Sequence, residues 1–427
     1  MADTYRENRK NELRKRVVDT DRLMKQTDQK KHEERQGGKP RRILVFLLIL
    51  LIVMALAAFV FYFMHRQYQN YAVNWAVDFS AGEGAIESDY EDYRDYGDGF
   101  VKVTRDGASY INSAGKTIWN QAYEMNNPYV AVNGDYCAIG DQGKTTIFIM
   151  NSSGTTGQAE TNLPISKIAV SATGVVYAVL EDSSASYITV FTKEGAALDI
   201  SIKSILSGDG YPIDISVSPD GTELITSFAY IANGSIQNKV IFYNLDEVGQ
   251  NAGNNRVVGG FTDDFAGHLV GRVRFSDNTH AQAFYDGGIA FFSTKVLTSP
   301  ELVNKVEIAD TIRSIAYSGD YVGVITFNSD ENTQETYRVT VYRVANGQEV
   351  LSVPVSINVT GFNIDNNMVY LYNDKKLRVY DMSGNLKFDG DIERPVAQAR
   401  GTKKVASPLG MDVLIGSKGY MESIKLK

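Results

Sequence analysis

The stretch Pro128–Thr161 reads PYVAVNGDYCAIGDQGKTTIFIMNSSGTTGQAET, and it decides the fold of this chain. Residues that favour strands (Val, Ile, Tyr, Thr and Phe) fill short runs, and residues that favour turns (Gly, Asn, Asp and Ser) separate these runs. The four runs are Pro128–Asn133, Tyr136–Gly140, Thr145–Met150 and Thr155–Thr161. The stretch therefore predicts four short antiparallel strands joined by hairpins.

The same alternation of strand-like runs and polar turns recurs along most of the chain. A strand-like run ends in a polar turn closed by glycine at Gly115, Gly154, Gly195, Gly347 and Gly384. Gly115, Gly154 and Gly195 follow one another at intervals of 39 and 41 residues, and Gly347 and Gly384 lie 37 residues apart. Four short strands repeated about every 40–50 residues are typical of a β-propeller, whereas a β-sandwich does not show this period. We therefore predict an all-β domain with the architecture of a β-propeller.

The number of blades follows from the starts of the innermost strands. We predict eight blades, with seven as the alternative, because candidate first strands begin near Ser88, Pro128, Ile165, Pro212, Leu269, Ile312, Ile357 and Pro395. The last blade has only three strands of its own, near Val396–Arg400, Met411–Ile415 and Tyr420–Leu426. We expect the segment Val73–Phe79 to supply its fourth strand and close the ring.

A single segment is suited to crossing a membrane. Ile43–Met64 is a run of 22 residues without charge or proline, and about 20 such residues in a helix span the hydrocarbon core of a bilayer. A cleaved signal peptide is the alternative, since Ala55-Leu56-Ala57 resembles a cleavage site. That triplet lies inside the apolar run, however, and the run exceeds the usual apolar region of roughly 7–15 residues. We therefore expect a retained span.

The charges beside this run indicate its orientation. Met1–Arg42 contains fourteen Lys or Arg and eight Asp or Glu, a net charge of +6, so the remainder carries −14 of the total of −8. By the positive-inside rule the basic arm is cytoplasmic and the remainder is extracytoplasmic. The predicted organisation is a basic cytoplasmic arm (1–42), a transmembrane helix (43–64), a linker or closing strand (65–88) and a propeller (89–427).

Motifs for catalysis and metal binding are absent from the sequence. The chain has no His-Glu-x-x-His and no Gly-x-Ser-x-Gly motif, and His268 and His280 stand alone. Gly140–Thr145 ends like a phosphate-binding loop but lacks its leading glycine and joins two strands. The single cysteine, Cys137, forms no intramolecular disulfide, which favours a bacterial envelope, and we expect it to be buried. We predict no catalytic, cofactor-binding or metal-binding residues and no cofactor.

An acidic run precedes the first predicted blade. Carboxylates can hold calcium, but this run lacks the spacing of a calcium loop, and a solvated acidic edge is the simpler interpretation. Tyr90, Tyr93 and Tyr96 alternate with its members, which are Glu87, Asp89, Glu91, Asp92, Asp95 and Asp98.

Several short strings resemble a known family. GFVKVTRDG (Gly99–Gly107), GKTIWNQ (Gly115–Gln121), Gly210-Tyr211-Pro212 before Ser218–Gly221, and Phe242–Asn244 are similar to strings in an uncharacterised family of Gram-positive bacterial proteins. Its members are single-span membrane proteins with an exported WD40-like or quinoprotein-like propeller that carries a domain-of-unknown-function label. The resemblance implies a layout and no activity. It also implies that Trp119 packs between blades. Ser218–Gly221 further resembles a turn of TolB-type propellers, and a hairpin turn explains it.

Two classes of function follow. We prefer a membrane-anchored extracytoplasmic scaffold that binds a protein, peptide or cell-envelope ligand through one face of the ring, with no enzymatic activity and no nucleic-acid partner. Loop residues such as those of Asp330–Glu335 are expected to carry the affinity. The alternative is an extracytoplasmic enzyme, a quinoprotein-like dehydrogenase or a glycan-cleaving enzyme, with two facing carboxylates or a metal in a central funnel.

Overall fold

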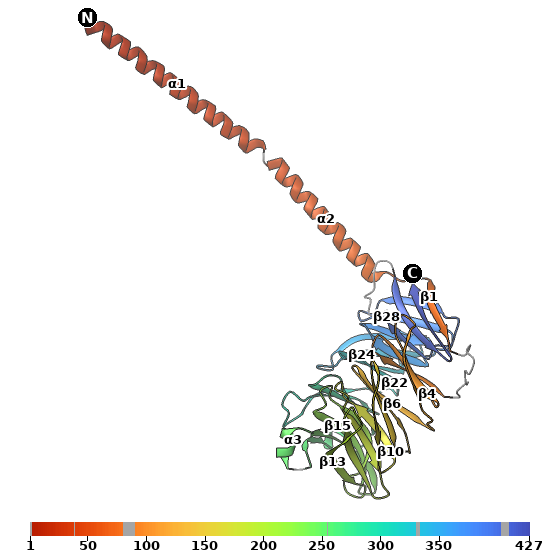
Figure 1. The fold of residues 1–427 in the computed structure, drawn as a ribbon. Helices are drawn as coiled ribbons and strands as arrows, with labels where there is room; N and C mark the ends of the chain where they lie inside the picture. Colours follow the sequence, from red (N-terminus) through yellow and green to blue (C-terminus); the bar gives the residue numbers. More distant parts are fainter. Residues whose placement is uncertain (1, 38, 80–89, 254, 330–333, 403–409) are drawn as a thin grey trace. The chain divides into compact units, whose positions relative to one another are not determined.

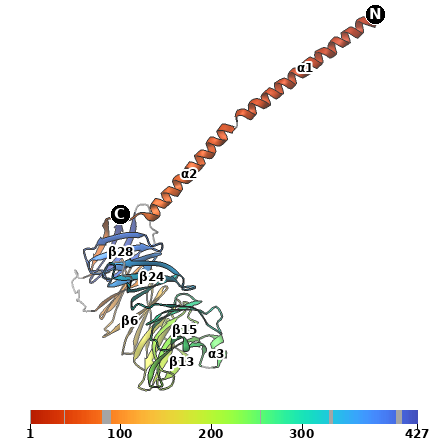
Figure 2. The ribbon, with the colours of Figure 1, turned by 180° about the vertical axis from the view of Figure 1, so that it is seen from behind.

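The computed structural model describes residues 2–37, 39–79, 90–253, 255–329, 334–402 and 410–427. The chain forms two compact units, Met1–Arg66 and Gln67–Lys427, which we describe separately. Figures 1 and 2 show the ribbon from opposite sides.

The N-terminal unit consists of two helices, α1 (Ala2–Gly37) and α2 (Lys39–His65). Helix α1 is rich in Glu, Lys, Arg and Gln, which are strong helix formers, and its described side chains are exposed. Within α2, Leu44–Tyr62 is long and apolar enough to cross a membrane, and no other helix among the described residues is.

The C-terminal unit is an eight-bladed β-propeller, so the alternative of seven blades is wrong. Each blade is an antiparallel four-stranded sheet, and the first strands of neighbouring blades contact one another around the axis. Blades 1 to 3 consist of β2 (Glu91–Tyr96), β3 (Gly99–Thr104), β4 (Gly107–Ile111) and β5 (Thr117–Ala122); β6 (Pro128–Asn133), β7 (Tyr136–Asp141), β8 (Thr146–Asn151) and β9 (Gly154–Glu160); and β10 (Ile165–Val170), β11 (Val176–Glu181), β12 (Ala185–Phe191) and β13 (Ala197–Ile205). Blades 4 and 5 consist of β14 (Tyr211–Val217), β15 (Glu223–Ala232), β16 (Ser235–Asn244) and β17 (Val257–Phe261); and β18 (Val270–Phe275), β19 (His280–Tyr285), β20 (Gly288–Ser293) and β21 (Glu301–Glu307). Blades 6 to 8 consist of β22 (Ile312–Tyr317), β23 (Tyr321–Phe327), β24 (Tyr337–Arg343) and β25 (Glu349–Val355); β26 (Gly361–Asp365), β27 (Met368–Tyr372), β28 (Lys376–Asp381) and β29 (Leu386–Asp391); and β30 (Gln398–Gly401), β31 (Met411–Ser417), β32 (Tyr420–Leu426) and β1 (Tyr71–Asp78). Two short helices, α3 (Glu247–Ala252) and η1 (Asp263–Phe265), flank β17.

The ring is closed by the two ends of this unit. Strand β1 pairs with β32 from Tyr71 opposite Leu426 to Asp78 opposite Tyr420. The predicted closing strand is therefore confirmed. Closure gives the three-stranded terminal sheet its fourth strand, and thus protects an edge that would otherwise be open to intermolecular pairing.

Two predicted strand starts were wrong by several residues. Blade 7 begins at Gly361 and not near Ile357, and blade 8 begins at Gln398 and not near Pro395. Ile357 and Val396 lie in the loops that precede these strands, yet both are buried. Their apolar side chains therefore resembled the first residues of a strand in the sequence. The predicted start near Ser88 lies outside the described residues, and β2 begins at Glu91.

The repeated glycines have a common conformational reason. Gly115, Gly154, Gly195, Gly347 and Gly384 all have φ between +67° and +133°, a range that L-amino acids with side chains rarely adopt. Four of them lie in the turn between the third and fourth strands of their blades, and Gly154 is the first residue of the fourth strand of blade 2. The sequence period therefore reflects a backbone requirement shared by blades 1, 2, 3, 6 and 7.

The core lies between neighbouring blades. Trp119 is buried in a cluster that joins blades 1 and 2, and its ring packs beside those of Tyr96 and Tyr110 at centroid distances of 6.3 and 6.2 Å. The predicted position of Trp119 between blades is confirmed. Cys137 lies in the same cluster with no exposed surface.

Candidate functional site

The described part of the acidic run does not gather into one site. Glu91 pairs with Lys102 at 3.4 Å, and Asp92 pairs with Arg94 at 2.8 Å. Asp95 accepts hydrogen bonds from two amide side chains, and Asp98 accepts them from Tyr110 and Ser113 at 2.7 Å each. Within the described residues no group of three carboxylates, histidines or cysteines could hold a metal ion. Glu87 and Asp89 lie outside the described residues.

The remaining motifs belong to turns. Gly140–Thr145 connects β7 to β8, so it has no helix to complete a phosphate-binding loop. Ser218–Gly221 lies between β14 and β15, where the Ser218 hydroxyl donates to Asp220 Oδ1 at 2.6 Å and the Gly221 N–H donates to the Ser218 carbonyl at 2.9 Å. The interpretation of Ser218–Gly221 as a hairpin turn is confirmed.

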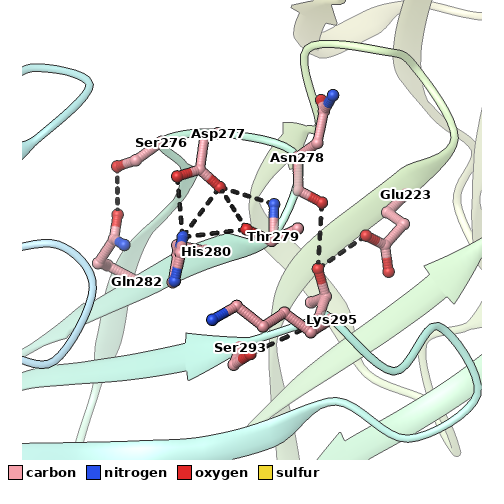
Figure 3. A network of polar contacts seen from close by, with 10 residues as sticks. Glu223, Ser276, Asp277, Asn278, Thr279, His280, Gln282, Ser293 and Lys295 are labelled. Carbon is pink, nitrogen blue, oxygen red and sulfur yellow. Dashed lines mark hydrogen bonds and ion pairs between the residues drawn. The ribbon is translucent and has the colours of Figure 1, made fainter.

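Each of the two propeller histidines is bound to an aspartate. His268 Nδ1 lies 2.8 Å from Asp286 Oδ1, and His280 Nδ1 lies 2.8 Å from Asp277 Oδ2. Figure 3 shows that His280 belongs to a wider polar network between blades 4 and 5. In this network Thr294 donates to Glu223 Oε2 at 2.8 Å and also contacts the carbonyl of Asn278.

Glu223 has an unusual environment in this network. Its residue is only 1 % exposed, and Oε1 is buried without a hydrogen-bond partner among the described residues. Burial raises the pKa of the Glu223 carboxyl from 4.5 to about 7, the hydrogen bond from Thr294 opposes the rise, and the charge of Asp220 adds to it. Burial without a neighbouring cation disfavours the ionised form of Glu223, because the charge loses its solvation by water. Ionisation of Glu223 is therefore unfavourable at this contact between blades 4 and 5.

A central cavity of about 650 Å³ lies inside the ring. Residues from the innermost strands of all eight blades line it. This volume is within the usual range for ligand pockets, roughly 300–1,000 Å³. The cavity is therefore a candidate binding site built by the ring as a whole.

One side of the cavity is rich in cations and tyrosines. Arg272 and Arg274 on β18 extend toward Tyr317 on β22, and the guanidinium carbon of Arg274 lies 3.9 Å from the centre of the Tyr317 ring. Arg272 Nε lies 3.8 Å from Asp214 Oδ2, which also accepts the backbone N–H of Val273 at 3.0 Å.

Two further cations lie near this side, of which Arg94 lines the cavity and Lys167 does not. Lys167 Nζ lies 5.4 Å from the centre of the Tyr129 ring, and the positive charge of Arg94 also acts on the Tyr129 phenol. Burial alone would raise the pKa of the Tyr317 phenol, but the positive charges of Arg274, Arg272 and Arg94 outweigh burial and lower it from 10.0. Three positive charges therefore act on the Tyr317 phenol and favour its ionised form. We call the group of Arg94, Lys167, Arg272, Arg274, Tyr129 and Tyr317 the cationic wall.

The opposite side of the cavity is tied together by hydrogen bonds, although Arg400 Nε has no hydrogen-bond partner among the described residues. Asp95 accepts the side-chain amides of Asn363 and Gln398 at 2.9 Å each. Arg400 donates to the Gly99 carbonyl at 2.9 Å and lies 3.5 Å from Asp365. These contacts tie blade 8 and blade 7 to blade 1, so this side closes the ring.

Exposed large apolar side chains lie on both faces of the propeller, and the two most exposed in its described part, Ile231 and Ile236, share one face. We define the top face as the one where the first strand of each blade begins; because strands alternate in direction, the hairpin between the second and third strands reaches the same face. In blade 4 this hairpin is formed by β15 and β16, with ten residues each. Ile231 and Ile236 pair across its tip and are 79 % and 68 % exposed. Further exposed apolar residues at strand ends on the top face of blades 3 to 6 are Ile205, Tyr211, Leu269 and Phe327.

Sequence reasoning missed both the cationic wall and the long hairpin. The hairpin had a signal in Asn233-Gly234, a dipeptide typical of tight hairpin turns, between two alternating runs. Both residues adopt positive φ, +52° and +76°. The cationic wall had no comparable signal, because its members come from five different blades.

Comparisons with known proteins support the fold. Residues 64–426 match the model of a family of unknown function, DUF5711. No curated protein matches the chain. Among solved structures, the chain is similar to Sqt1 from Saccharomyces cerevisiae, with a TM-score of 0.51 and 9 % identity over 80 % of this chain and 100 % of that one. It is also similar to AztD from Citrobacter koseri, with a TM-score of 0.51 and 11 % identity over 71 % of this chain and 87 % of that one. At these identities the similarity establishes the fold alone.

Proposed function

We propose that this chain, which belongs to the DUF5711 family, is a membrane-anchored binding module whose propeller holds a protein partner on its top face. Helix α2 supplies the anchor, and the charge step of +6 against −14 favours an extracytoplasmic propeller. The module acts by binding and not by catalysis.

The observation that carries this proposal is the apolar tip of the β15–β16 hairpin. Ile231 and Ile236 lie side by side at its end, with the half-buried Tyr230 and Gln237 pairing next along the ladder. Fully burying an isoleucine side chain is worth about 1.5–3 kcal/mol, so covering this tip would contribute roughly 3–6 kcal/mol to binding. Ile205, Tyr211, Leu269 and Phe327 add exposed apolar side chains on the same face, where a partner could cover them together with the tip.

The polar surroundings of the patch support specificity. Lys239 lies 5.2 Å from the ring centre of Tyr230, and Arg313 lies 4.9 Å from that of Phe327. Apolar residues surrounded by cations and tyrosines resemble the composition of protein interfaces, where a dry centre is bordered by a polar rim. Of the predicted binding loop Asp330–Glu335, residues 330–333 lie outside the described residues.

The test compares partner capture by matched variants in crosslinked membranes. The variant Ile231→Lys with Ile236→Lys places charges at the tip, and the control Leu198→Lys changes an exposed apolar residue (38 % exposed) at the other end of blade 3. We expect the tip variant to lose the proteins that wild type and control both capture, at an unchanged thermal midpoint. Equal capture of the same proteins by all three would contradict the proposal. Turnover of a glycan or a quinone-dependent substrate, abolished by replacing one cavity carboxylate, would favour an enzyme instead.

A further inference from the structure

The cationic wall contains more positive than negative charge. Four cations converge there, and the carboxylates that face them are Asp92 and Asp214. Asp92 pairs with Arg94, and Asp214 lies beside Arg272. Arg274 has no carboxylate within ion-pair distance among the described residues. The wall therefore carries an excess of positive charge that is centred on Arg274.

Arg274 is also incompletely hydrogen-bonded. Its Nε atom is buried and has no hydrogen-bond partner within the described part of the chain. Burial lowers the pKa of the Arg274 guanidinium, Tyr317 opposes this effect, and the like charge of Arg272 adds to it. The ring of Tyr317, 3.9 Å from the guanidinium carbon, stabilises this charge, but no carboxylate neutralises it.

The geometry fits an oxyanion. A guanidinium presents a planar fork of donors that matches the two oxygens of a carboxylate or phosphate group. Arg272 and Arg274 lie two positions apart on one strand, so their side chains share one side of β18 and can approach the same group. Tyr129 and Tyr317 border the space with aromatic surface. The cavity of about 650 Å³ leaves room for a small molecule.

We propose that the cationic wall is a binding site for a small anionic ligand, whose carboxylate or phosphate group is held by Arg274 and Arg272 beside Tyr317. The site is separate from the apolar top-face patch, so either proposal can fail alone. Such a ligand would neutralise the excess charge of the wall. It would also connect blade 5 to the blades that provide Arg94 and Tyr129.

The experiment titrates the full-length chain in nonionic detergent and low-salt buffer with inorganic phosphate and, separately, with acetate, by calorimetry. Arg274→Met removes the central cation and keeps an unbranched side chain, and Arg343→Gln is the control because Arg343 is exposed on β24. We expect saturable binding of at least one anion by wild type and control, and binding at least about tenfold weaker in Arg274→Met. Tighter binding of phosphate would indicate a ligand with a phosphate group, and tighter binding of acetate would indicate a ligand with a carboxylate. Weak anion binding by the basic segment 1–42 is the same in all three proteins and cancels in the comparison.

A second measurement follows the ionisation of Tyr317 in the cationic wall. Alkaline titration of tyrosinate absorbance should show an early-ionising tyrosine that is missing in Tyr317→Phe. Saturating anion should move this ionisation to higher pH, because it neutralises the guanidiniums that stabilise the phenolate. No saturable binding of either anion by wild type, equal binding by Arg274→Met, or an ionisation of Tyr317 that does not respond to bound anion would each overturn the proposal.

Discussion

Replacing Glu223 by glutamine should make the propeller more stable at neutral and alkaline pH and leave it unchanged in acid. Glu223 is buried between blades 4 and 5 and accepts one hydrogen bond, from Thr294, with no cation near it. The change Glu223→Gln keeps the shape and an oxygen for Thr294 but cannot ionise. It therefore isolates the cost of the buried charge.

The magnitude follows from the pKa of this carboxyl. Burial raises it from 4.5 to about 7 in the folded protein. At about 1.4 kcal/mol per pH unit, this difference corresponds to roughly 3 kcal/mol. Because the folded state binds the proton more tightly than the unfolded state, stability falls as the pH rises from about 4.5 to about 7, and the full cost is present above that range. Below about pH 4.5 the carboxyl is protonated in both states, and the cost disappears.

The assay is urea unfolding of the full-length protein in detergent at a series of pH values. The difference in unfolding free energy between Glu223→Gln and wild type should grow by roughly 3 kcal/mol between about pH 4.5 and about pH 8. A constant offset from altered packing does not affect this slope. The control Glu301→Gln, at an exposed position on β21, should show no such growth. A difference that does not depend on pH would refute the reasoning.

Three further predictions concern closure, reactivity and topology. Deleting Tyr420–Lys427 removes β32 and the partner of β1, and it should cost roughly 6 kcal/mol and give insoluble protein, because Met421, Ile424 and Leu426 are fully buried; a soluble product with an unchanged thermal midpoint would contradict ring closure. Burial raises the pKa of the Cys137 thiol, so an alkylating reagent should modify it only in denaturant, as mass spectrometry would show; rapid labelling of the native protein would contradict this. Protease added to wall-stripped cells should digest the propeller and spare Met1–Arg42, whereas a soluble mature form beginning after Ala57 would contradict a retained anchor.

The fold could be derived largely from the sequence because its determinants are local and recur. In blades 1, 2, 3, 6 and 7 the chain needs a positive φ just before or at the start of the fourth strand, and glycine supplies it at Gly115, Gly154, Gly195, Gly347 and Gly384. The three-stranded remainder at the C-terminus required a partner strand, and Tyr71–Asp78 provides it. Where buried connections are apolar, as at Ile357, local pattern alone placed the strand too early.

The candidate sites depend on contacts that the sequence does not encode locally. Arg94, Arg274 and Tyr317 lie on strands of blades 1, 5 and 6, and only the closed ring brings their charges into one field. The cost of burying Glu223 likewise arises because blade 5 covers it and provides Thr294. Turn geometry and strand alternation act between residues that are neighbours in the chain, so the sequence by itself determined the repeating blades and the apolar N-terminal helix, while the choice of eight blades over seven came from the structure. The convergence of cations in the cavity and the position of the apolar hairpin on one face were decided by tertiary structure, because eight separate sheets must first close around a common axis.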